Sequence, residues 1–387
     1  MTKADSSSAD LAYAEETTSY GVAETGNYTR FRFTGESLGQ ETETSQSEEI
    51  RNDRQIADIV RTGISASGDV SVEMSYGAHD DLLEAGLLSA DWIAEVAVIT
   101  ADANTSASSA DDSFNHTTAW DTNPTVGAWV HIAGFTDPAN NGYFKVAAGV
   151  TGTKMIVDAT LVTESAPASV TIRQGAYIQN GTEFRSFTIE KEWTDLTNQF
   201  MQLLGMVVDG FNLEIETGSI LKGGFSFIGK SMTRTASAAG TFVDNAANAV
   251  MNSVDDVFGV MEGAPDASLT ITGASFAIAN NMRARQAVGT LGAVDVGKGT
   301  LNITGSLKTW LEDEVLIEKY LNFTETALTF ILEDATGKAY VIELPAIKYT
   351  SGTVVASGQN EDVLVELDFE AKISDADSRT IQVSRYA

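Results

Sequence analysis

The chain has 387 residues, and its 54 acidic residues against 24 basic ones give a formal net charge of −30. This charge argues against a protein that grips nucleic acid, because phosphate affinity comes from Lys and Arg that displace counterions, but DNA could still slide past without sticking. The chain lacks cysteine, which excludes disulfides and thiolate chemistry, and no apolar run approaches the roughly 18 residues of a membrane span.

Most of the predicted elements are strands. Residues 1–18 are largely polar, and we expect a disordered tail there. Many later segments alternate apolar and polar residues, as half-buried strands do. They are FRFTGESL, DVSVEMSY, FRSFTIEKEW, FNLEIETG, GGFSFIGK, SLTITGASF, TLNITGSL, ALTFILED, AYVIELPAI and DVLVELDFEAK. The expected fold class is therefore mainly β.

Two helices are predicted among these strands. HDDLLEAGLLSADW (residues 79–92) carries acids in its first turn, which favours a helix start. TWLEDEVLIEKYL (residues 309–321) opens with Thr309 and Glu312 at the spacing of a capping box. The pattern of residues 193–208 also indicates a helix, whereas EDATGKAY (residues 333–340) is typical of a tight turn.

The order strand, long loop, strand, helix and paired strands occurs twice. The matching segments are residues 31–38 with 269–276, residues 68–76 with 299–307, and residues 187–189 with 328–330. An internal duplication explains this order, although alternating strands also resemble one another by chance.

The duplication predicts two tandem β-sandwich domains, each with a flanking helix. The first is discontinuous and comprises residues 19–93 and 182–236, and the second comprises residues 266–387 after a linker over residues 237–265. The intervening residues 94–181 contain several short strands between turn signals. They predict a small β-barrel or sandwich inserted in a loop, where insertions are tolerated.

The sequence indicates no catalytic, metal or cofactor site. His79, His116 and His131 lack metal-ligand spacing, and acid pairs such as Asp80-Asp81 lack the order of a calcium loop. Phosphate-loop and nucleophile-elbow motifs are absent. A carboxylate pair for glycoside hydrolysis stays open, because any of many acids could form one.

One polar loop, residues 39–67, concentrates the scarce arginines. Hairpin loops usually have two to five residues, and longer ones tend to be functional or disordered. The loop carries three arginines and several aliphatic side chains, and such a loop should not stay free in water but should dock on a partner. These residues are Arg51, Arg54, Arg61, Ile50, Ile56 and Ile59. The second repeat carries Arg283 and Arg285 in the corresponding loop. Head-to-tail contacts between copies, which build rings or filaments, are predicted; a loop folded on its own domain is the alternative.

These residues resemble a known family. The runs TGESL (residues 34–38), EIR-x-DRQ (residues 49–55) and G-x-SASG (residues 63–68) are similar to the major tail tube proteins of long, flexible-tailed bacteriophages. The resemblance is best over residues 20–76. It implies a β sandwich with a flanking helix, inner sheets that join around a ring, and a loop (residues 40–67) that reaches the next ring.

The resemblance carries further expectations. Rings of this family are usually hexamers of single-domain subunits, so a duplicated chain would form a homotrimeric, pseudo-hexameric ring. Carboxylates lining the lumen would repel DNA phosphates during ejection, and the candidates are Glu36, Glu73, Glu214 and Glu216. The implied partners are further copies of the chain and the tape-measure, tail terminator and tail-tip proteins, in a virion tail assembled in the bacterial cytoplasm.

No enzymatic activity, cofactor or membrane insertion is expected. The alternative function is a carbohydrate-binding, adhesin-like surface protein built of β modules, which would stay monomeric or form small closed oligomers. A second rival is a tail-associated glycosidase, which would turn over polysaccharide and depend on one carboxylate.

Overall fold

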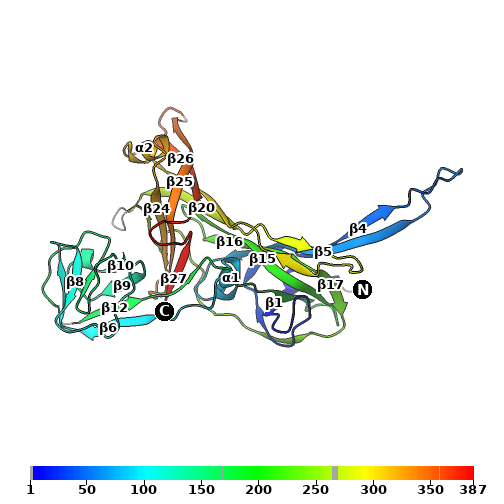
Figure 1. The fold of residues 1–387 in the computed structure, drawn as a ribbon, viewed down its shortest axis with the longest axis horizontal. Coiled ribbons are helices and arrows are strands. Elements are labelled where there is room, and N and C mark those ends of the chain that lie inside the picture. The colour runs from blue at the N-terminus through cyan, green and yellow to red at the C-terminus, as the bar shows by residue number, and fades with distance from the viewer. Residues whose placement is uncertain (1–2, 168, 264–268, 357) are drawn as a thin grey trace.

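The computed structural model describes residues 3–167, 169–263, 269–356 and 358–387. Within them it contains 27 strands, two α-helices and the short 3-10 helices η1 (Ser6–Ser8) and η2 (Pro138–Asn140). The predicted mainly β fold class is confirmed. Figure 1 shows an elongated molecule with a long hairpin at one end and a small β module at the other.

Eight strands form one continuous antiparallel sheet through the chain. In order of pairing they are β3 (Phe33–Glu36), β5 (Ile59–Glu73), β16 (Lys222–Gly229), β15 (Phe200–Glu216), β20 (Ile271–Ala279), β23 (Asn302–Trp310), β26 (Val363–Ala371) and β25 (Ala339–Ala356). We call this the inner sheet. Its strands alternate buried residues with half-buried or exposed ones that are mostly polar, so the sheet has one core face and one largely polar face.

A second layer of strands packs on the core face. In the first half of the chain it comprises β1 (Ala9–Glu15), β14 (Phe187–Trp193) and β17 (Ser231–Thr235), with β2 (Gly26–Arg30) and β18 (Gly240–Val243) at its edge. In the second half it comprises β19 (Val257–Glu262), β24 (Thr326–Glu333), β27 (Gln382–Tyr386) and β13 (Ala176–Gln179). Here "first half" means residues 9–86 and 187–243, and "second half" means residues 257–386. Strand β13 comes earlier in the chain but pairs with the second half.

The long strands β15 and β25 belong to both layers. A β-bulge interrupts each one, between Val208 and Gly210 in β15 and between Tyr349 and Ser351 in β25. A bulge bends a strand, so each long strand can leave one layer and continue in the other. The core between the layers buries Phe225, Phe330 and many other apolar side chains.

The two halves repeat the same strand pairings. The pairs β1–β14, β14–β15, β15–β16 and β5–β16 recur as β19–β24, β24–β25, β25–β26 and β23–β26. The bulges recur as well, including those in β3 and β20. This register aligns residues 31–38 with 269–276, as the sequence predicts. It aligns Gly68 with Gly305, so the sequence alignment of residues 68–76 with 299–307 is wrong by six residues. It aligns Ile189 with Leu328, so the alignment of residues 187–189 with 328–330 is wrong by two residues.

The two helices are shorter than predicted. Helix α1 spans Asp80–Gly86 and α2 spans Val315–Leu321. The predicted capping box is wrong, because Thr309 lies in β23 and the Asp313 carboxylate instead accepts a hydrogen bond from the Val315 amide (3.0 Å).

Residues 193–208 do not form the predicted helix and mostly belong to β15. Leu203, Met206 and Val207 are all fully buried, so both faces of this part of the strand are covered. A strand buried on both faces has a continuous apolar run, which periodicity cannot distinguish from a buried helix segment.

The predicted disordered tail over residues 1–18 is wrong for β1. This strand pairs along its whole length with β14, and Leu11, Ala12 and Tyr13 are buried. Strands β18 and β19 likewise lie inside the predicted linker over residues 237–265. The rest of that segment includes residues 264–265, which lie outside the described residues.

Two small sheets lie between α1 and β13. One contains β6 (Val96–Asp102), β9 (Trp129–Ala133), β10 (Gly142–Lys145) and β12 (Val170–Gln174), and the other contains β7 (Thr105–Ser108), β8 (Ser113–His116) and β11 (Lys154–Ile156). They share a hydrophobic cluster of their own. This module touches the second half through charged groups: Lys145 of the module pairs with the buried Glu343 (2.7 Å), and Arg379 of the second half donates to the Gly127 carbonyl of the module (2.8 Å).

Candidate functional site

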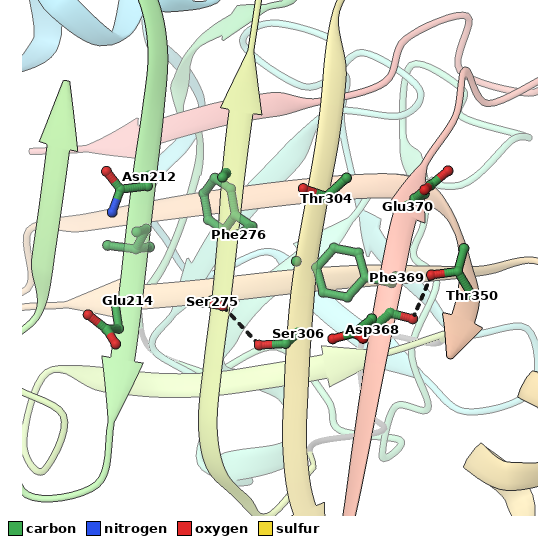
Figure 2. A pocket seen from close by; sticks show the side chains of 13 residues that line it. Asn212, Glu214, Ser275, Phe276, Thr304, Ser306, Thr350, Asp368, Phe369 and Glu370 are labelled. Atoms are coloured by element: carbon green, nitrogen blue, oxygen red, sulfur yellow. Dashed lines mark hydrogen bonds between the residues drawn. The ribbon is translucent and has the colours of Figure 1, made fainter. Parts of the chain in front are cut away.

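The polar face of the inner sheet is one candidate site. Residues directly opposite each other on neighbouring strands share a face, and one such row runs Glu73, Lys222, Glu214, Ser275, Ser306 and Asp368. Figure 2 shows part of this face, where a hollow is lined by polar side chains of β15, β20, β23, β25 and β26 together with Phe276 and Phe369. The Ser275 and Ser306 hydroxyls are 2.9 Å apart.

This polar face carries excess negative charge. Its acidic side chains are Asp69, Glu73, Glu214, Glu216, Glu366, Asp368 and Glu370, and its basic side chains are Lys222, Lys308 and Lys348. Lys308 is paired with Glu366. The three acids on β26 were not among the predicted candidates, although the alternation in DVLVELDFEAK signals them.

Three of the four predicted lumen candidates share this face, and Glu36 does not. Glu36 lies opposite Val70, which is fully buried, so its side chain is on the core face. There its carboxylate accepts hydrogen bonds from Lys191 Nζ (2.5 Å) and the Leu38 amide (2.8 Å). The cause is the bulge between Phe33 and Gly35, which adds one residue and reverses the alternation.

The second candidate site is the hairpin of β4 (Gly39–Gln46) and β5, which projects from the body as an arm (Figure 1). Ile50 at its tip is fully exposed, and Ile56 and Ile59 are more than half exposed. Within the described residues none of the three joins a hydrophobic cluster. The alternative of a loop folded on its own domain is therefore wrong.

Within the described structure the arginines of the arm make no hydrogen bond or ion pair with the body. Arg51 binds both carboxylate oxygens of Asp53, at 3.0 and 2.7 Å, and this pairing lowers the Asp53 pKa. Arg54 has a positive φ of 59° at the turn. Arg61 lies farther down the arm, opposite Thr44. The tip therefore presents isoleucines beside charged groups whose pairing is local.

The corresponding loop of the second half is compact. It forms the short hairpin β21 (Arg283–Arg285) and β22 (Asp295–Gly297). Arg285 pairs with Asp295 at 2.7 Å, and Arg283 donates to the Lys298 carbonyl. The Leu291 carbonyl accepts from the Ile64 amide at 3.0 Å. This loop thus lies against the root of the arm, and Arg283 and Arg285 do not form a second arm.

The three histidines lie on different elements: His79 precedes α1, His116 ends β8 and His131 lies in β9. His79 is buried and His131 is partly buried, and burial lowers the pKa of each to about 4. His116 bonds to Asp102 (3.0 Å) and stacks on Trp120. Among the described residues, no three His, Cys, Asp or Glu side chains gather as metal ligands. No described helix has the length and apolar character needed to cross a bilayer.

A match to a family model shows which protein family has this sequence pattern. The model for phage tail tube proteins matches residues 6–371. The chain belongs to the phage tail tube protein family. It is therefore a structural component of a bacteriophage tail. A search of curated proteins finds no match for this tail tube protein.

Proposed function

We propose that this tail tube protein polymerises into stacked rings around a central channel, and that the acidic face of the inner sheet lines the channel. The observation that carries the proposal is the continuity of that face over eight strands and both halves of the chain. A face with more carboxylates than lysines repels DNA phosphates, so DNA passes during ejection without binding. No catalytic step is needed.

The arm supplies the contact between rings in this proposal. The eight residues of β4 alone span about 26 Å at the rise of a β-strand, so the arm carries its tip far from its root. The exposed isoleucines would pack on the neighbouring ring, and Arg51, Arg54 and Arg61 would pair with its carboxylates. The acidic body of a second copy offers many such partners.

The repeated pairings support an internal duplication in which each half acts as one tube domain. Three chains would then supply six tube domains and form a trimeric, pseudo-hexameric ring. The module between α1 and β13 lies at the end opposite the arm (Figure 1) and would project from the tube. Assembly in the host cytoplasm and contacts with tape-measure, terminator and tail-tip proteins follow from the family resemblance.

Electron microscopy of the purified full-length chain, with light scattering at rising concentration, tests this function. We expect stacked rings or hollow tubes whose end views have threefold or pseudo-sixfold symmetry. The triple change Arg51→Glu, Arg54→Glu and Arg61→Glu should stop stacking while rings persist. A monomer that binds glycan and never assembles would favour the adhesin alternative.

A further inference from the structure

The junction between the two halves is already a strand-to-strand contact. Seven residue pairs join β15 to β20, from Gly210 opposite Ala279 to Glu216 opposite Gly273. The apolar residues of this contact, such as Leu213 (1% exposed) and Phe276 (2% exposed), are buried in the core. The chain therefore contains one complete example of how a first half meets a second half.

The two outer edges of the inner sheet are equivalent to the two strands of this junction. Counting from the equivalent bulges, β25 beyond Ser351 corresponds to β15 beyond Gly210, and residues 35–41 correspond to residues 273–279. In the described structure this part of β25 pairs only with β26. Val354, the counterpart of Leu213, is 48% exposed. A core position is thus left open at this edge.

The helices show the same difference. Helix α1 lies under the second half: Asp80 accepts from Tyr340 and pairs with Arg385, and Leu83 and Leu87 line an apolar cavity with Ile342 and Val383. Helix α2 has no buried residue. Its Leu321 is 71% exposed, and Phe323 just beyond it is 55% exposed. Nothing in the described chain covers α2 as the second half covers α1.

The first half carries residues at the positions equivalent to those of the second half that cover α1. The register places Met201 of β15 at the position of Ile342, and Arg234 of β17 at the position of Val383. Met201 is half-buried and Arg234 is exposed. Within the described residues Arg234 forms no ion pair and bonds to neutral groups, the Gln199 side chain (3.0 Å) and the Asn198 carbonyl (3.3 Å). Acidic side chains precede and begin α2, including Asp313, Glu314 and Glu318. Arg234 is thus suited to the acids around α2.

We propose that the open flank of the second half, β25 and α2, docks on the first half of another copy in the register of the internal junction. This rests on the ring assembly proposed above and assigns its contact. Thr353 then lies opposite Gly39 of the next copy, and Val355 lies opposite Ser37. Helix α2 packs against Met201 and Arg234 of that copy. The contact is head-to-tail, so it closes into a ring when the rotation per chain allows.

Engineered cysteines test this register directly, because the chain has none of its own. Opposed residues of antiparallel strands have Cα atoms about 4.5–5.5 Å apart, within disulfide reach. The test variant carries Thr353→Cys and Gly39→Cys; a Cβ at Gly39 would meet only the Ser37 carbonyl, at 3.9 Å. A second variant, Val355→Cys with Ser37→Cys, guards against misfolding of the first.

Two matched controls accompany these variants. Asn212→Cys with Ala277→Cys occupies the equivalent internal pair, and must give a disulfide within one chain. Thr353→Cys with Glu41→Cys keeps the same face but shifts the register by two residues, which separates the Cα atoms by more than about 7 Å, the limit for a disulfide. The full-length chains are oxidised after assembly and separated by non-reducing denaturing electrophoresis.

The expected result is a linked ladder that ends at a trimer for the 39–353 and 37–355 pairs, and loss of that ladder for the 41–353 pair. Rings or tubes that form while both test pairs stay unlinked, or while the shifted pair links equally well, overturn the register but leave the tube function intact. A chain that never assembles contradicts the proposed function itself. The two failures are therefore distinguishable.

Discussion

The two halves of this tail tube protein repeat one set of strand pairings but expose opposite features. The first half extends its long loop as the β4–β5 arm and buries α1 under the second half. The second half keeps the equivalent loop against the root of the arm and leaves α2 open. In the proposed assembly the first half therefore provides the contact between rings, and the second half provides an open flank within the ring.

The largest expected effect comes from removing the arm tip. Replacing residues 47–58 by an Asn-Gly turn keeps the paired part of the hairpin, since Asn-Gly favours a two-residue hairpin turn. We expect rings without stacked tubes, seen by electron microscopy. The matched control shortens the loop between β21 and β22 in the second half. Tubes that persist without the arm tip would contradict its role, and so would tubes lost equally in the control.

A smaller effect is expected at the buried end of α1. Asp80→Ala leaves Arg385 and the Tyr340 hydroxyl without their shared carboxylate. Breaking a buried pair in this way should lower the free energy of unfolding by about 3–5 kcal/mol, measured by urea denaturation. The control is Asp121→Ala, because Asp121 is exposed and its carboxylate makes no ion pair or hydrogen bond within the described residues, so its loss should cost well under about 1 kcal/mol. Equal losses would show that the Asp80 contacts do not hold α1 in place.

The residue that precedes each helix should make the stability of the two halves depend differently on pH. Burial lowers the pKa of His79 from 6.5 to about 4, whereas Glu314 before α2 is exposed. Between pH 6.5 and 4 the unfolded chain binds a proton at His79 that the folded chain excludes. Stability should therefore fall as pH falls through this window, by up to about 3 kcal/mol.

His79→Gln should flatten that part of the pH profile, measured as unfolding midpoints at several pH values. Glu314→Gln serves as the control in the second half. A profile with the same slope in the His79 variant would contradict the assignment, because another group would then be responsible.

The smallest effect on folding is expected at α2. Leu321→Ser changes an exposed side chain, so the free energy of unfolding should change by no more than about 0.5 kcal/mol. Assembly should weaken nonetheless, because the proposed cover over α2 is lost. An increase of about tenfold in the concentration needed for assembly corresponds to about 1.4 kcal/mol. Light scattering measures it, and unchanged assembly would contradict a role for α2 in the contact.

Much of the inner sheet could be predicted from the sequence because one of its faces is polar. The alternation in GGFSFIGK and DVLVELDFEAK gives β16 and β26 directly. The composition of residues 39–67 likewise pointed to a loop that does not fold on its own domain. Where both faces of a strand are buried, as around Leu203 and Met206 in β15, the alternation disappears and the helix prediction failed.

Other features depend on contacts that leave no mark in the local sequence. The bulge in β3 turns Glu36 away from the other acids, and only the pairing with β5 locates that bulge. The sequence alignment of Gly68 is wrong by six residues for a similar reason. Strand pairing makes Gly68 equivalent to Gly305, and the similarity of the two segments does not show this pairing. Strand β1 was missed because its order comes from pairing with β14, which lies far along the chain.

The central claim is that the acidic face of the inner sheet lines the channel of a tube. A cryo-electron microscopy map of tubes assembled from the full-length chain tests it most directly. We expect three chains in each ring, with Glu214 and Asp368 facing the channel and the β4–β5 arm reaching the adjacent ring. A map in which these carboxylates face outward, or in which the core-facing layer of β14 and β24 lines the channel, would contradict the account.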